Sequence, residues 1–189
     1  MNSDVLSIVA RHDPSFWASS LIHRAKVDLP FDASQLPEDA PLLFDTTVYI
    51  DQLKGELPNT IVSLMSSRPI FHASPALAEL AVTVGVLNPT DPRTKQALLP
   101  ITETLARIPL DRVISPSNEN WLEAAVIVGV LARTQGIAKE ARRKILNDTL
   151  LFLMAADNGL ILISRNTRDV DLLLQMKHGS KILFYDRRN

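Results

Sequence analysis

Residues 147–174 read NDTLLFLMAADNGLILISRNTRDVDLLL, and this stretch decides the fold of the chain. From Asp148 onwards, its first half is an almost wholly apolar run of helical length that stops at Asn158-Gly159. A short apolar run at 160–163 predicts a buried strand, and the polar turn SRNTRD follows it at 164–169. In open α/β sheets, ligand-binding sites lie at the carboxyl ends of such strands. We therefore expect a helix that brings an acid to a pocket, and a strand and turn that bring further polar groups.

Asp148 is the acid in this helix. The helical period places it on one stripe with Ile145, Phe152 and Ala155, so its neighbours are apolar. A carboxylate on a buried helix face is costly unless a cation or hydrogen-bond donors meet it. An ordinary surface acid would have Lys or Glu at position 151, 152 or 155, and none is present there. The alternative is a helix that begins after Asn147, with Asp148 at its start.

Outward from this stretch, short apolar strands alternate with helices. Strands are expected at 41–45, 69–72, 111–115, 160–163 and 181–185. Helices are expected at 46–54, 59–67, 74–87, 91–107, 118–135, 137–158 and 167–177. This pattern predicts an α/β sandwich in which a short parallel sheet of about five strands is covered by helices, with helix dominant. The helix at 118–135 should be largely buried through an apolar face that contains Trp121, Ala125, Val128 and Ala132 and is widened by Val126, Ile127 and Val130.

The chain is expected to divide into an N-terminal appendage, 1–41, and an α/β domain, 42–189. Asp13 and Pro14 predict a helix from 14 to about 26, with Asp13 as its N-cap. The segment DLPFDASQLPEDAP at 28–41 has the composition of a linker, because it holds three prolines and four acids. We expect the appendage to pack against the main domain or a second subunit.

Composition excludes several classes of protein. The 189 residues include no cysteine, which rules out disulfides and thiolate metal sites. Neither of the long apolar runs approaches the roughly 20 residues that span a bilayer, and no basic and apolar leader opens the chain. A cytoplasmic protein with no membrane partner is expected. The phosphate-binding patterns of dinucleotide-binding and P-loop proteins are absent, as are HExxH and a nucleophile elbow.

The formal net charge of −1 means that any nucleic-acid binding must rely on local basic patches. The candidates are Arg142-Arg143-Lys144 before Asp148, Arg165 and Arg168 in the turn, and Arg187-Arg188 at the end. Solvated helix faces and a polar tail are the alternative interpretation of these patches.

Further acids lie at or near the junctions of elements. Asp45 ends the first strand, where it could instead cap the following helix. Glu79 lies on a mostly apolar helix face, although a mid-helix Glu is commonly solvated. With Asp148, Asn166 and Asp169 they would form an all-oxygen site, which suits Mg²⁺ or Mn²⁺. Such an ion activates water for displacement at phosphorus, so the implied substrate is a phosphodiester.

Four segments, in order, resemble the motifs of PIN-domain nucleases, in particular the VapC-type toxins of toxin–antitoxin pairs. They are Asp45 after the first strand, Glu79 in SPALAEL, Asp148 in NDTLLFLMAADNGL, and ISRNTRDV at 163–170. The resemblance covers roughly 42–185. It implies a Rossmann-like three-layer sandwich and a Mg²⁺- or Mn²⁺-dependent endoribonuclease that hydrolyses RNA. It also implies a small antitoxin partner and a homodimer.

The resemblance assigns roles to individual residues. Asp45, Glu79 and Asp148 match the family's first three acids, with Asp45 and Asp148 as the principal metal ligands. The slot of the fourth acid holds Asn166, and Asp169, three residues on, matches a second acid that many members carry. Glu79 and Asp169 would then complete the metal-binding and catalytic cluster, with support from Thr46 and Asn166. The basic residues near these acids, Arg165, Arg168 and Arg143, are expected to contact the RNA.

A rival hypothesis is a PIN-like RNA-binding or protein-interaction module with weak or lost nuclease activity. The loss of a charge at Asn166 and the near-neutral net charge favour it.

Overall fold

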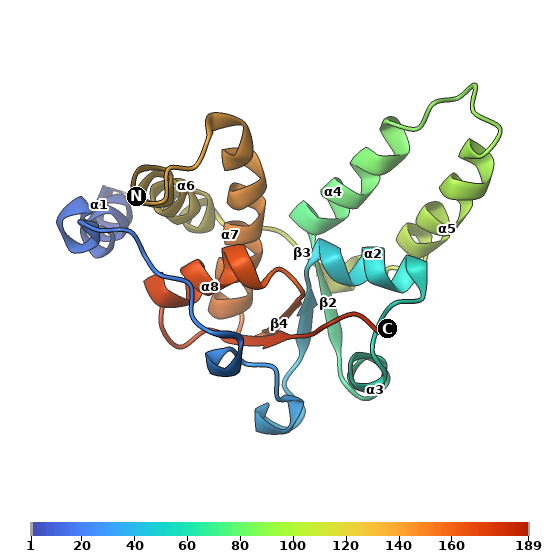
Figure 1. The fold of residues 1–189 in the computed structure, drawn as a ribbon, viewed down its shortest axis with the longest axis horizontal. Coiled ribbons are helices and arrows are strands. Elements are labelled where there is room, and N and C mark those ends of the chain that lie inside the picture. Colours follow the sequence, from blue (N-terminus) through green and yellow to red (C-terminus); the bar gives the residue numbers. More distant parts are fainter. Residues whose placement is uncertain (1, 189) are drawn as a thin grey trace.

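A five-stranded, all-parallel sheet with strand order β3-β2-β1-β4-β5 lies at the centre of the fold (Figure 1). The structure is a computed structural model that describes residues 2–188. All five strands are found where the sequence predicts them, with ends displaced by one or two residues: β1 (Leu42–Phe44), β2 (Ile70–Ala73), β3 (Val113–Ile114), β4 (Ile161–Ser164) and β5 (Lys181–Phe184).

The central strand β1 explains why the sheet sequences are continuously apolar. Leu42, Leu43 and Phe44 are each at most 2% exposed, because helices cover both faces of the sheet. From β1 the chain builds outward to β2 and β3, and then returns to add β4 and β5 on the other side of β1. The carboxyl ends of β1 and β4 are therefore adjacent at the point where the strand order reverses. This is the position at which open α/β sheets bind ligands.

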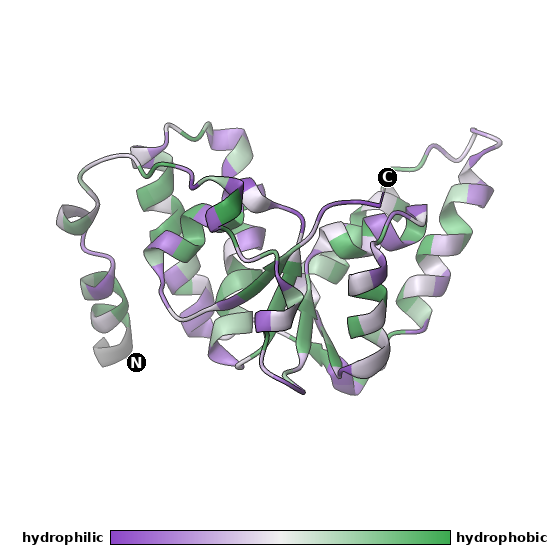
Figure 2. Cartoon of the chain, turned by 60° about the horizontal axis from the view of Figure 1, so that its bottom comes forward, coloured by the Kyte–Doolittle hydropathy of each residue, from purple (hydrophilic) through white to green (hydrophobic). Residues whose placement is uncertain are grey.

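The same reversal sorts the helices into two layers, because right-handed crossovers in opposite directions place their helices on opposite faces. One layer holds α2 (Thr46–Lys54), α3 (Asn59–Ser67), α4 (Ser74–Gly85) and α5 (Thr94–Ala106). The other holds α6 (Asn118–Thr134), α7 (Arg142–Asp157) and α8 (Thr167–Met176). The fold is thus the expected three-layer α/β sandwich, with hydrophobic strands between the helices (Figure 2). Across residues 2–188, none of the helices combines the length and apolar character required to cross a membrane.

Helix ends follow local signals, whereas the buried face of α6 follows the prediction only in part. Ser117 caps α6 in a reciprocal pair with Asn120, as expected for a Ser at this position. Val128, Ile127 and Val130 are buried as predicted, but Trp121 is 46% exposed and Ala125 is also exposed, so that part of the predicted face is wrong. Ala124 and Leu131 complete the buried face, because α6 packs against both α7 and α1.

The helix predicted from residue 14 to about 26 is also wrong. The N-terminus forms α1 (Asn2–Arg11), and Asp13 caps only a single 3-10 turn, Pro14–Trp17. Beyond it the chain is extended because tertiary partners hold it. The Arg24 backbone N–H and Nε donate to the two carboxylate oxygens of the buried Asp171 on α8, at 2.9 and 2.6 Å. These long-range bonds outweigh local helix propensity.

The segment before β1 makes further contacts with the sandwich. Helix α1 packs on α6, where Ile8 is 2% exposed and His12 Nε2 lies 2.9 Å from Glu123 Oε1. Farther along, the Phe184 N–H donates to Pro30 O at 2.8 Å, so this segment hydrogen bonds to the edge strand β5. A covered edge is protected from pairing with another chain.

A buried acid on α2, Asp51, ties the end of the chain to the sandwich. It is fully buried and accepts hydrogen bonds from Arg165 Nε at 2.7 Å, Tyr185 Oη at 2.9 Å and Arg187 Nε at 2.9 Å. Part of the predicted basic patch at the C-terminus is therefore engaged within the fold. The network holds α2 against the turn after β4, which is the region that carries the candidate site.

Candidate functional site

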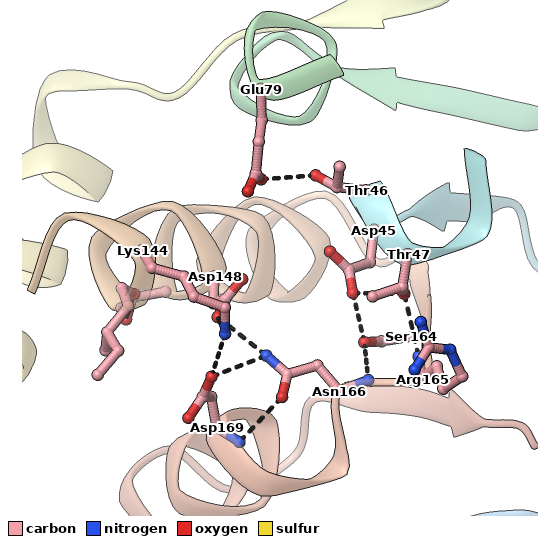
Figure 3. Close-up of polar contacts among 12 residues, drawn as sticks. Asp45, Thr46, Thr47, Glu79, Lys144, Asp148, Ser164, Arg165, Asn166 and Asp169 are labelled. Atoms are coloured by element: carbon pink, nitrogen blue, oxygen red, sulfur yellow. Dashed lines mark hydrogen bonds and ion pairs between the residues drawn. The ribbon is translucent and has the colours of Figure 1, made fainter. Parts of the chain in front are cut away.

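Asp45 follows β1 and is 4% exposed. It occupies the N-cap position of α2, yet its side chain makes no capping hydrogen bond. Its Oδ2 instead accepts from Thr47 Oγ1 at 2.7 Å and from Ser164 Oγ at 2.6 Å. The capping alternative is thus not the role of this side chain. The hydroxyl of Ser164, at the end of β4, fixes the carboxylate across the switch point (Figure 3).

Asp148 lies within α7 and is 7% exposed. The helix runs continuously through Asn147, so the alternative of a helix start at this position is wrong. The stripe predicted for Asp148 is observed, because Ile145, Phe152 and Ala155 are all buried. Hydrogen-bond donors contact the buried carboxylate, and they offset the free-energy cost of burying its charge.

Those donors come partly from the turn after β4. Asn166 Nδ2 donates to Asp148 Oδ2 at 2.9 Å and to Asp169 Oδ2 at 3.0 Å, while Asn166 Oδ1 accepts from the Asp169 N–H at 3.3 Å. The Asn166 N–H in turn donates to Ser164 Oγ at 2.9 Å. Asn166 therefore bridges two acids that repel each other and caps α8 at the same time (Figure 3).

The remaining donor is Lys144, which the sequence analysis did not assign to the acids. Its Nζ lies 3.3 Å from Asp148 Oδ2 and 2.5 Å from Asp169 Oδ2. Lys144 is one turn before Asp148 on α7. The signal that would have found it is the i, i+4 spacing of opposite charges on one helix face.

Glu79 reaches the site from α4, which packs against α7. Its side chain points from α4 toward the other acids (Figure 3), and its Oε2 accepts from Thr46 Oγ1 at 2.8 Å. Glu79 is half-buried rather than solvated. Thr46 therefore supports a member of the acid cluster, although its partner is Glu79 rather than Asp45.

Three adjoining clefts meet at the acids. A cleft of about 400 Å³ brings together most of the residues predicted from sequence: Asp45, Thr46, Glu79, Asp148, Arg165, Asn166 and Arg168. Asp169 lines a neighbouring cleft of about 510 Å³. Arg143 lines a third, of about 630 Å³, which shares Glu79 and Lys144 with the first.

The three arginines predicted to contact RNA differ in their surroundings. Arg165 is held in the cleft wall, with its N–H on Thr47 Oγ1 at 3.1 Å and its guanidinium on Asp51. Arg168 and Arg143 are exposed, and neither side chain donates a hydrogen bond to any residue whose side chain the structure describes. These two guanidinium groups are available to a ligand in the clefts.

The acids carry unequal electrostatic environments. Burial raises the pKa of Asp45, and burial together with the nearby Asp45 carboxylate raises the pKa of Asp148 to about 7. For Asp169 burial acts in the same direction, but hydrogen bonds from Lys144 and Asn166 outweigh it and lower its pKa. Negative charge is therefore well compensated at Asp169 and poorly compensated at the Asp45–Asp148 pair.

The residues present fit a hydrated divalent cation rather than a fully protein-bound one. Within residues 2–188, no three His, Cys, Asp or Glu side chains are grouped as a metal site. Mg²⁺ does not need such a group, because proteins hold it by one or two carboxylates together with water and substrate phosphate. The buried, under-compensated Asp45 and Asp148 supply that donor set, with Glu79 on the facing helix.

The raised pKa of Asp148 predicts how pH changes the stability of the metal-free protein. The folded state holds a proton on Asp148 up to about pH 7, whereas the unfolded chain releases it near 3.8. Because folding then takes up protons between these values, the free energy of unfolding should fall as pH rises from about 4 to about 7. The fall is a few kcal/mol at most, since one pKa unit corresponds to about 1.4 kcal/mol.

Chemical denaturation with chelator present, at several pH values, measures this trend. Asp148→Asn, which cannot titrate, should have a shallower pH dependence than wild type. Identical slopes for the two proteins between pH 4 and pH 7 would contradict the assignment.

Comparison with known proteins places this geometry in a known fold. No family model and no curated protein matches the sequence. In the crystal structure of VapBC2 from Rickettsia felis bound to a DNA fragment from their promoter, a chain matches with a TM-score of 0.53 and 16% identity, over 77% of this chain and 99% of that one. A chain of VapBC-1 from nontypeable Haemophilus influenzae matches with a TM-score of 0.52 and 18% identity, over 76% of this chain and 97% of that one. The chain thus has the PIN-like α/β fold of these VapBC structures.

Proposed function

We propose that this protein is a divalent-metal-dependent endoribonuclease of the cytoplasm that acts as the toxin of a toxin–antitoxin pair. The observation that carries the proposal is the pair of buried, poorly compensated carboxylates, Asp45 and Asp148, at the open switch point of the sheet. Glu79 adds a third acid on the facing side of the cleft. The fold shared with the VapBC structures supports the same function.

Each residue of the site has a defined task in this proposal. Asp45 and Asp148 hold the cation, and Ser164 and Asn166 orient the two carboxylates by the hydrogen bonds that fix their Oδ2 atoms. Glu79, steadied by Thr46, accepts a hydrogen bond from water in the cleft. When bound, the cation supplies activation of that water and offsets the charge that develops in phosphodiester displacement.

Asp148→Asn should abolish cleavage of single-stranded RNA in Mg²⁺ or Mn²⁺, because the amide keeps the shape of the side chain and removes the ligand charge. We expect a loss of at least about 100-fold in rate, which corresponds to roughly 3 kcal/mol of transition-state stabilisation. Asp111→Asn is the matched control, because Asp111 is an exposed acid that lines none of the three clefts, and it should retain activity. A fluorogenic RNA assay with and without chelator measures both, and equal rates for wild type and Asp148→Asn would contradict the catalytic assignment.

RNA would enter through the cleft of about 630 Å³, where the half-exposed ring of Trp121 lies with Arg143 beside the acids. Single-stranded nucleic acids bind by stacking bases on such rings and by placing phosphates near cations, and each stacked base contributes about 1–3 kcal/mol. This cleft joins the acid site through Glu79 and Lys144. A strand seated there would place its backbone at the acids.

Trp121→Ala should therefore weaken the binding of a short single-stranded RNA by about tenfold, equivalent to about 1.4 kcal/mol. Fluorescence anisotropy in the Asp148→Asn background separates binding from cleavage. Leu122→Ala is the control, because Leu122 is similarly exposed, at 42%, but does not line the cleft. Equal affinities for the two variants would exclude Trp121 as a stacking surface.

A non-catalytic PIN-like module that binds RNA or protein is the second candidate. It is favoured by Lys144, whose ammonium already neutralises part of the acid cluster, and by Asn166 at the slot of an expected acid. The two candidates separate in the nuclease assay, because this one predicts RNA binding without metal-dependent cleavage.

We also propose a small antitoxin partner, which the fold likeness to the VapBC structures supports, and a homodimer. The exposed apolar residues Val82 and Val86 on and just beyond α4, and Leu99 on α5, lie on two helices that pack together and offer an interface surface. Static light scattering of the purified chain should give a mass of about twice 20.9 kDa. A monomer mass at micromolar concentration would contradict the homodimer.

A further inference from the structure

We propose that Lys144 occupies the second cation position of the acid cluster, so that this centre takes up a single divalent ion at Asp45 and Asp148 and leaves Asp169 free of metal. The inference rests on the proposed metal-dependent function. It specifies how many ions the centre binds and which acids bind them.

The contacts of Lys144 form a closed arrangement with Asn166. Both side chains donate to the same two oxygens, Oδ2 of Asp148 and Oδ2 of Asp169, at distances between 2.5 and 3.3 Å. Two donors therefore bridge two acceptors, and the ammonium lies between the two carboxylates, where a bridging ion would otherwise neutralise them (Figure 3). Among the residues described, no donor reaches the other oxygen of Asp148, Oδ1, so it remains available for coordination.

Asp169 and Asp45, at the two ends of the acid cluster, differ in how well their negative charge is compensated. Asp169 has the Lys144 ammonium and the Asn166 amide at hydrogen-bond distance, so its negative charge is already matched. Asp45 accepts only hydroxyl donors from side chains, Thr47 and Ser164, and has no cation in contact. A divalent ion is therefore attracted to the Asp45 half. At the Asp169 half it would meet a like charge and would have to displace Lys144.

The position of Lys144 on α7 makes this arrangement a property of the local sequence. One helical turn separates it from Asp148, so its side chain reaches along the helix to that acid and onward to Asp169 on α8. The Lys144 side chain is 58% exposed, so it approaches from the solvent side of the cluster. Removing the ammonium would open that side to a second ion without disturbing the core.

Mn²⁺ binding to the full chain tests the proposal without any measurement of activity. Isothermal titration, with electron paramagnetic resonance of free Mn²⁺ as an independent count, should give one ion per chain for wild type and two for Lys144→Met. Arg143→Met is the matched control, because it removes a neighbouring cation on the same helix that has no contact with the acids, and it should still bind one ion. Circular dichroism establishes that each variant is folded.

Two carboxylate variants keep the test decisive if Lys144→Met fails to fold. Asp169→Asn should leave the Mn²⁺ affinity within about twofold of wild type, whereas Asp148→Asn should weaken it more than tenfold. Two ions in wild type, one ion in folded Lys144→Met, or a tenfold loss in Asp169→Asn would each overturn the proposal while leaving the metal-dependent function intact. No Mn²⁺ binding in wild type would overturn both.

Discussion

The rest of this structure depends on two neighbouring carboxylates, Asp45 and Asp148, that are almost completely shielded from solvent. Asp45 and Asp148 are each less than 10% exposed, and the proximity of Asp45 contributes to the raised pKa of Asp148. Such a pair is costly to fold and persists only where the surrounding structure fixes it from several sides. Here the residue after β1 is one acid and α7 supplies the other, while Ser164 at the end of β4 and Asn166 in the following turn supply the hydroxyl and amide that hold them.

The topology of the sheet explains why these elements meet. Because β1 and β4 are neighbours and parallel, Asp45 and Ser164 lie side by side although they are 119 positions apart in the chain. The α7 crossover then places Asp148 over the same edge. A fold built from local hairpins would not bring such distant residues to one edge. The site therefore forms because the strand order reverses between β1 and β4, and no single sequence motif creates it.

The N-terminal segment is anchored on α6 and α8. It packs α1 on α6 and runs along α8 to the edge of β5, and its His23 lines the cleft that also holds Asp169. Its attachments include contacts with two buried acids: His12 Nε2 lies 2.9 Å from Glu123 Oε1, and Arg24 Nε donates to Asp171 Oδ1 at 2.6 Å. A buried carboxylate that loses a hydrogen-bond donor is costly. These contacts therefore stabilise the outer surfaces of the sandwich.

From β1 onwards, the sequence by itself determined the order of strands and helices, the α/β sandwich class, and the acids of the candidate site. Those features depend on short-range physics: apolar runs, helical period, and capping residues such as Ser117. Only the tertiary structure decided which oxygens meet which donors. The sequence predicts Arg165 as an RNA contact, but in the structure its guanidinium is hydrogen bonded to Asp51. Lys144 contacts Asp169 only because α8 packs beside α7. The physical reason is that a charged side chain takes the nearest partner in space, and sheet order and crossover handedness choose that partner from distant parts of the chain.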